Sequence, residues 1–226
     1  MQLKRIQSRI EAYKQFLKSK DAYDRVYLWD IQLNFQEKWD LSASDLATMY
    51  DQSLQSKVSN RLWNQRGFEP KKMMTLFFEL EADYTKSVFA ELFDEAKEID
   101  GRLDRFQYYS GELLLMYKKK YPESIENNHY QNHRMISIYL AMKYPSLYTI
   151  YDYEEFVHLL QSIGTLKIPQ HDDFPRFVKI ARTLFTFLKK DDTLMTLHQK
   201  RFKNYEDYPK NSLLLVYDFI KFDYSD

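Results

Sequence analysis

Histidines and paired carboxylates are the side chains in this sequence that could bind a metal or act as acid–base catalysts. His129 and His133 lie four residues apart, a spacing that on a helix would place both imidazoles on one side, as metal ligands require. No HExxH motif and no nearby third ligand accompany them. Adjacent acids occur at 154–155, 172–173 and 191–192, but sequence neighbours diverge on a helix. We therefore predict no metal site and no catalytic carboxylate pair.

Motifs for nucleotide binding and nucleophilic catalysis are also missing. A phosphate-binding loop needs glycines so that backbone amides can approach the phosphates, yet the 226 residues include 4 glycines and neither GxxxxGK[ST] nor GxGxxG. None of the 5 histidines stands in the context of a nucleophile elbow. The chain has no cysteine, which excludes disulfides and thiolate metal sites. The sequence thus predicts a chain that is not itself an enzyme and that binds no cofactor.

Charge is balanced overall but unevenly distributed. The 33 basic residues match the 33 acidic ones. Residues 1–20 and 166–203 are nevertheless rich in Lys and Arg, whereas residues 91–104 are mainly acidic. Such basic clusters can contact a phosphate backbone, although a solvated helix face is the simpler explanation of each cluster. The candidates for phosphate contact are Lys4, Arg5, Arg9, Lys179, Arg182, Lys200 and Arg201.

The elements that would position these residues are expected to be helices. With 44% hydrophobic residues, 4 Gly and 6 Pro, the composition favours an all-α fold, a multi-helix orthogonal bundle. Apolar spacing predicts helices near 3–17, 24–39, 42–54, 70–78, 86–106, 112–119, 132–143, 153–163, 174–188 and 213–222, with one more short helix before the last. Ser42 or Ser44 is the expected N-cap of the third helix, and residues 56–70 are expected to form a loop. Residues 147–151 (LYTIY) predict an extended connector or one short β element.

The polar stretch 164–173 is the best candidate for a domain boundary. It would separate a helical recognition domain, residues 1–163, from a C-terminal helical extension, residues 164–226, packed on it. One single domain over residues 1–226 is the alternative. No apolar run reaches the length of about 20 residues that spans a bilayer, and the N-terminus is charged from its fourth residue. A cytoplasmic chain without membrane contact is expected.

Several strings resemble the domain that precedes the motor in McrB-type AAA+ proteins of restriction and antiphage defence. The resemblance covers roughly residues 23–160, and Asp218-Phe219-Ile220 also fits. Its most specific block is Asn128-His129-Tyr130-Gln131, then Ser137-x-Tyr139-Leu140, Lys143-Tyr144-Pro145 and Tyr148-x-Ile150-Tyr151-x-Tyr153. Earlier strings are YLWDIQLNFQEKWD, Phe68-x-Pro70 with Met73 and Met74, Val88-Phe89-x-x-Leu92-Phe93-Asp94-Glu95 and Arg102-x-x-x-Phe106.

This resemblance implies a place in a modification-dependent restriction system. In such systems a hexameric AAA+ motor hydrolyses nucleotide and works with a McrC-type nuclease, while the N-terminal domain recognises the target, often modified DNA. The present sequence contains no Walker motif, so nucleotide hydrolysis would belong to a motor that is not in this chain. N-terminal domains of this group differ in fold, so base reading cannot be carried over residue by residue.

We predict a non-catalytic DNA-recognition domain. In the candidate binding site, Asn and Gln side chains can make paired hydrogen bonds to base edges, and tyrosine rings can stack on bases. The candidate residues are Asn128, His129, Tyr130, Gln131, Arg134, Tyr148 and Tyr151. A simpler interpretation has Asn128 capping a helix, Tyr130 in the core and Gln131 exposed. The alternative function is a protein-interaction adaptor that senses a phage protein or docks a nuclease or motor. Zero net charge and the apolar stripe over residues 3–17 favour that alternative.

Overall fold

The computed structural model describes residues 2–55, 62, 70–130, 132–202 and 210–222. The helices within these ranges are α1 (Leu3–Phe16), α2 (Lys20–Asp24), α3 (Tyr27–Lys38), α4 (Leu46–Ser53), α6 (Pro70–Leu80), α7 (Ala82–Leu92), α8 (Ile99–Lys120), α9 (His133–Lys143), α10 (Tyr153–Ser162), α11 (Phe174–Lys189), α12 (Asp192–Lys200) and α13 (Leu214–Lys221). These ranges contain no strand, and the predicted all-α fold is confirmed. The predicted loop over 56–70 falls almost entirely outside the described residues. None of the described helices has the length and apolar character needed to cross a bilayer.

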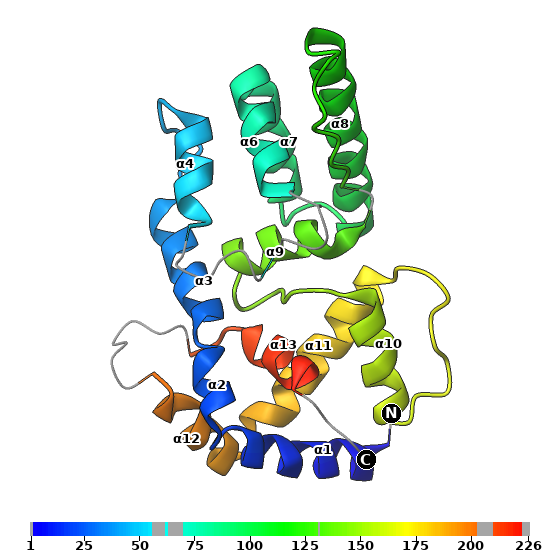
Figure 1. Ribbon diagram of the computed structural model, residues 1–226. Coiled ribbons are helices and arrows are strands. Elements are labelled where there is room, and N and C mark those ends of the chain that lie inside the picture. Colours follow the sequence, from blue (N-terminus) through cyan, green and yellow to red (C-terminus); the bar gives the residue numbers. More distant parts are fainter. Residues whose placement is uncertain (1, 56–61, 63–69, 131, 203–209, 223–226) are drawn as a thin grey trace.

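The helices form two groups, one above the other in Figure 1. In the upper group α4, α6, α7 and α8 stand in a row in which each contacts the next, and α9 crosses below the row and packs on α3. In the lower group α1 lies along the base, and α13 packs between α10 and α11. Helix α12 packs against both α11 and α1. The row of upright helices therefore stands on a second, more compact layer.

Packing contacts run across the boundary that the sequence suggested at 164–173. Helix α1 contacts α12, and α10 contacts α13, so the lower group draws on both sides of that stretch. Buried apolar side chains of both groups belong to one continuous cluster. The division into residues 1–163 and 164–226, like the alternative of one domain, stays a prediction.

The single helix predicted over residues 86–106 is wrong, because the chain reverses direction there. Helix α7 ends and α8 begins within this range. In the intervening turn the Asp94 carboxylate accepts a hydrogen bond from the backbone N–H of Ala96 at 3.1 Å. The buried guanidinium of Arg102 donates to the carbonyl of Leu92 at 2.9 Å, which satisfies one of the last carbonyls of α7. Helix α8 then continues through the next predicted helix.

Several helix termini follow simple capping rules, and the structure corrects one predicted cap. The predicted caps Ser42 and Ser44 are wrong, because α4 is capped by Asp45, whose carboxylate accepts from the N–H of Thr48 at 2.9 Å. Pro70 begins α6, as its missing N–H allows. The lone left-handed residue of the described glycines, Gly164, ends α10 at φ +67°.

Residues 147–151 form an extended connector, and the short β element considered for them is wrong. No strand lies beside them among the residues that the structure describes, and the N–H groups of Leu147 and Tyr148 both donate to the carbonyl of Tyr144. Two other backbone groups of the connector pair with side chains. The N–H of Tyr151 donates to Ser137 Oγ at 2.8 Å. The carbonyl of Leu147 accepts from Nε of Arg182 at 3.0 Å. This connector joins α9 of the upper group to α10 of the lower group.

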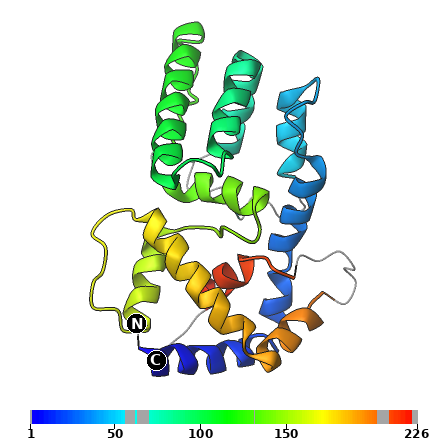
Figure 2. The same cartoon turned by 180° about the vertical axis from the view of Figure 1, so that it is seen from behind.

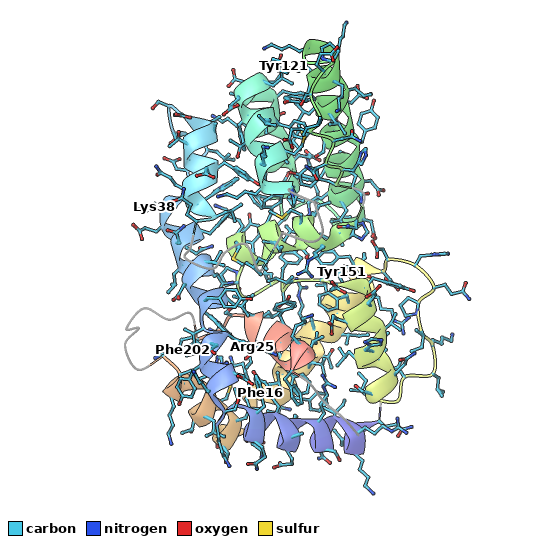
Figure 3. The ribbon with its side chains drawn as sticks, in the orientation of Figure 1. Phe16, Arg25, Lys38, Tyr121, Tyr151 and Phe202 are labelled. Atoms are coloured by element: carbon cyan, nitrogen blue, oxygen red, sulfur yellow. The ribbon has the colours of Figure 1, made fainter. Side chains whose placement is uncertain are left out.

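A buried carboxylate lies at the centre of the lower group. Asp218 of α13 is 0% exposed and accepts hydrogen bonds from Tyr13 at 2.7 Å and from Arg201 at 2.8 Å. Arg25, labelled in Figure 3 beside α13, adds a longer ion pair at 3.3 Å. Arg9 donates to the carbonyls of residues 219 and 220 at 3.2 and 3.0 Å. These side chains tie α1, α2, α12 and the C-terminal end of α13 together, where unpaired carbonyls attract cations.

Candidate nucleic-acid interface

Helix α11 presents one apolar face to the core and one basic face to solvent. Its start is set by Asp173, whose carboxylate accepts from the N–H of Arg176 at 3.2 Å, and by Pro175 in the first turn. The buried face consists of Phe174, Phe177, Val178, Ala181, Leu184 and Leu188. Figure 2 shows α11 crossing the near face of the lower group diagonally. One side of the helix is therefore open to a partner.

The exposed residues of α11 and of the position after it define a surface that we call the α11 face. It consists of Lys179, Arg182, Thr183, Thr186, Lys189 and Lys190. No Asp or Glu occurs in α11 itself. Lys179 and Lys190 make no ion pair with any residue that the structure describes, whereas Lys189 donates to Asn211 at 2.8 Å. Four cations on one face of about three helical turns can follow a phosphate backbone.

A charged cavity of about 310 Å³ lies at the N-terminal end of the α11 face. Its wall includes Arg182 and Lys179 from α11, Arg102 from α8, and Tyr148 from the extended connector. The Tyr148 hydroxyl accepts from Arg102 at 2.6 Å and donates to Glu95 at 2.9 Å. Burial raises the pKa of Tyr148, while its hydrogen bond from Arg102 acts in the opposite direction. Arg102, Tyr148 and Glu95 are thus paired with one another, and the cavity wall contains both signs of charge.

The predicted stacking role of the tyrosines is wrong, because all three rings are buried. Tyr130, Tyr148 and Tyr151 are 3%, 3% and 1% exposed. The guanidinium of Arg182 lies over the ring of Tyr148, 5.4 Å from its centroid, and Phe174 stacks on that ring at 6.4 Å. Figure 3 shows Tyr151 at the junction of the two groups. Each ring packs in the core, and a nucleic-acid base cannot reach it.

A second cavity, of about 270 Å³, lies where α9 and α10 begin. Arg134 lines it and is held by Asp152 at 2.9 Å and by the carbonyl of Leu62 at 3.2 Å. His133 also lines it, with Nδ1 at 3.7 Å from Asp172. Burial lowers the pKa of His133, and the neighbouring acids oppose that effect. With the carboxylates of residues 152, 154 and 172 around one arginine, this cavity repels phosphate.

The other residues of the predicted base-recognition turn, Asn128–Gln131, are partly accessible to solvent where the structure describes them. Asn128 is half-buried and His129 is exposed, while Gln131 lies outside the described residues. Helix α9 is capped by Asn132, whose side chain accepts from the N–H of Arg134 at 3.2 Å. Because α9 begins at His133, the pair His129 and His133 does not share a helix. No group of three or more His, Cys, Asp or Glu side chains in the described ranges could hold a metal.

The predicted phosphate contacts divide into exposed and buried side chains. Lys4 and Arg5 are exposed on α1, Lys200 is exposed on α12, and Lys179 and Arg182 belong to the α11 face. The prediction is wrong for the two remaining arginines. Each is 5% exposed and donates to buried acceptors: Arg9 to carbonyls of α13, and Arg201 to Asp218 and to the carbonyl of Ala22.

The sequence interpretation missed four residues of the α11 face: Thr183, Thr186, Lys189 and Lys190. For the two threonines the signal was present in the predicted helix over 174–188, because spacings of three, four and seven residues place them beside Lys179 and Arg182. Lys189 and Lys190 lie just beyond that predicted end, and the same spacing continued by one and two residues places them on this face. The hydroxyls of both threonines donate to carbonyls one turn earlier, at 2.9 and 3.0 Å.

The chain matches no protein-family model, and neither a curated protein nor a solved structure is significantly similar to it. The α11 face is therefore interpreted from its own geometry and charge.

Proposed function

We propose that this chain is a non-catalytic target-recognition domain that binds DNA through the α11 face. The observation that carries the proposal is a solvent-exposed helix face with four cations and no acid in the helix. Phosphate contacts of this kind provide affinity and position a protein on the duplex. Lys4, Arg5 and Lys200, exposed on neighbouring helices, extend the proposed phosphate contacts.

The wider setting that we propose is a cytoplasmic, McrB-like modification-dependent restriction system. Sequence resemblance alone supports this assignment. In such a system a separate AAA+ motor hydrolyses nucleotide and a McrC-type nuclease cuts the DNA, so recognition would be the task of this chain. A non-catalytic role agrees with the two cavities at the junction, where the arginines are engaged in structural bonds with Glu95 and Asp152. Target reading would fall to exposed polar residues such as His129.

Binding to labelled DNA tests the proposal. Fluorescence anisotropy of the purified chain with methylated, hydroxymethylated and plain duplexes should show binding at low salt. The variant Lys179→Ala/Lys190→Ala should bind more weakly to all three duplexes, because phosphate contacts are independent of sequence. Lys38→Ala/Lys72→Ala removes two exposed cations outside the α11 face and should bind like the parent chain. Absence of binding even at low salt would refute the DNA proposal for this chain.

One observation favours the alternative, a protein-interaction adaptor. A groove of about 850 Å³ runs between α1 and the junction of α11 with α12. Leu3, Ile6, Ile10 and Phe187 give it an apolar floor, and Leu3 is 54% exposed. An apolar protein interface would weaken little with salt, whereas phosphate binding weakens steeply. Salt dependence therefore separates the two functions.

A further inference from the structure

Helix α8 has an outward face that packs against no other part of the described chain. In both views α8 stands at the outer edge of the upper row (Figures 1 and 2). Its inner face is buried through Arg102, Leu103, Phe106, Ser110, Leu113, Leu114 and Tyr117. On the opposite face Tyr108 is 64% exposed and Leu115 is 66% exposed. These two large side chains lie on one stripe with Gly111 between them.

The spacing along this stripe is that of a helix-pairing seam. Asp104, Tyr108, Gly111, Leu115 and Lys119 follow one another at intervals of four, three, four and four residues, which keeps them on one side of the helix. A Cβ atom added to Gly111 would meet nothing within 4 Å. Two flanking bulky side chains and a central glycine form a shallow depression, in which a second helix can approach the backbone closely.

The charges of the stripe are complementary to those of a second copy of α8 that runs in the opposite direction. Asp104 and Lys119 are exposed and form no ion pair within the part of the chain that the structure describes. They lie equally far from the midpoint between Gly111 and Glu112, about 11 Å on either side at 1.5 Å per residue. Tyr108 and Leu115 are also symmetric about that midpoint. An antiparallel copy of α8 therefore places each acid beside a lysine and each tyrosine beside a leucine.

We propose that α8 is a homodimer interface, in which two copies of this chain pair their α8 helices antiparallel about a two-fold axis near Gly111. A two-fold interface uses the same patch on both subunits, and such a patch must be self-complementary. In a parallel pair Asp104 would face Asp104 and Lys119 would face Lys119, so the charges select the antiparallel arrangement. The basic C-terminal turn, with Lys118, Lys119 and Lys120, then lies near Asp100 and Asp104 in the first turns of the partner helix.

Sedimentation velocity over a wide concentration range tests the dimer. The parent chain should approach twice its monomer mass as concentration rises. Asp104→Lys and Lys119→Asp should each weaken the dimer roughly tenfold, and the double variant should restore it, because the swapped charges pair again. Glu79→Lys, an exposed charge reversal on α6, should leave dimerisation unchanged. A parent chain that stays monomeric at every concentration would overturn the proposal.

A second variant separates loss of the dimer from loss of the fold. Gly111→Gln adds a side chain at the crossing point but replaces glycine with a better helix former. The monomer should therefore unfold at higher temperature while the dimer is lost. If Gly111→Gln dimerises like the parent chain, close approach at this position is refuted.

Cysteine cross-linking tests the orientation, because the chain contains no cysteine of its own. In a mixture of Asp104→Cys and Lys119→Cys chains, oxidation should join one of each kind. Neither variant alone should cross-link efficiently. Efficient cross-linking of Asp104→Cys to itself would show a parallel pair and overturn the antiparallel arrangement.

Discussion

Replacing the buried carboxylate of Asp218 should cause one of the largest losses of stability available to a single substitution in this chain. Asp218→Asn keeps the size and shape of the side chain but removes its charge. The Arg201 side chain beside it is 0% exposed and lies 2.8 Å from the carboxylate. Arg201 also lies 5.2 Å from the centroid of the Trp29 ring and donates to the carbonyl of Ala22 at 2.9 Å. The guanidinium would therefore stay buried without its counter-charge.

The magnitude of the loss follows from the free-energy cost of leaving one charge of a buried ion pair without its partner. Removing one charge of such a pair typically destabilises a protein by about 3–5 kcal/mol. The hydrogen bond from Tyr13 at 2.7 Å and the weaker ion pair with Arg25 at 3.3 Å also lose strength. Because a domain is stable by only about 5–15 kcal/mol in total, we expect Asp218→Asn to lower the free energy of unfolding by about 3–5 kcal/mol.

Urea unfolding followed by circular dichroism measures this loss. Asp24→Asn, an exposed carboxylate on α2, is the matched control and should change the free energy of unfolding by less than about 0.5 kcal/mol. Replacing both partners, as in Asp218→Leu/Arg201→Met, should recover part of the stability because no unpaired charge remains. If Asp218→Asn costs no more than its control, the buried ion network is not what holds α1, α2, α12 and α13 together.

Stability should also depend on pH and on two glycines. Burial, with a smaller contribution from the Arg201 charge, holds the pKa of His198 well below its usual value of 6.5. The unfolded chain binds that proton below pH 6.5 and the folded chain does not, so the free energy of unfolding should fall by about 1.4 kcal/mol per pH unit of acidification below that value. Urea unfolding as a function of pH should show this slope, and His198→Gln should flatten it; a flat parent profile would contradict the assignment. Gly164→Ala should lower the thermal midpoint through a cost of about 1 kcal/mol, because φ is +67° and the new Cβ would lie 2.7 Å from Gln2. Gly111→Ala should raise that midpoint by a comparable amount, measured in dilute solution, because its Cβ meets open space inside a helix. A higher midpoint for Gly164→Ala would contradict the first argument, and a lower midpoint for Gly111→Ala would contradict the second.

Helix content was predictable from the sequence because it depends on local pattern. The apolar spacing of residues 174–188 and of 132–143 agrees closely with α11 and α9. The reversal at 93–98 was not predictable from the same signal, since the apolar positions keep helical spacing across the break. What sets the break is Arg102, whose buried guanidinium binds the Leu92 carbonyl and Glu95. Such a contact is tertiary and leaves no periodic trace.

Side-chain roles were harder to predict than elements. An arginine in a basic cluster looks the same in sequence whether it faces solvent or the core. Arg9 and Arg201 are buried because the C-terminal carbonyls of α13 and the Asp218 carboxylate lie beside them, more than 200 and 17 residues away along the chain respectively. Conversely, Lys179 and Arg182 could be placed on an exposed face because the apolar stripe of α11 fixes the buried side. The apolar pattern of an amphipathic helix therefore predicts which of its charged residues are solvent-exposed more reliably than a cluster of basic residues in the sequence does.

The salt dependence of DNA binding tests the central claim, that the α11 face contacts phosphate. Anisotropy titrations with one duplex at several salt concentrations give the slope of log K against log salt. For the parent chain this slope should be steep, and Lys179→Ala/Lys190→Ala should reduce it by about 1.8, which corresponds to two lost phosphate contacts. Lys38→Ala/Lys72→Ala should leave the slope unchanged. An equal slope for the parent chain and the α11 variant would contradict the account and move the DNA contact, or the partner itself, elsewhere on the molecule.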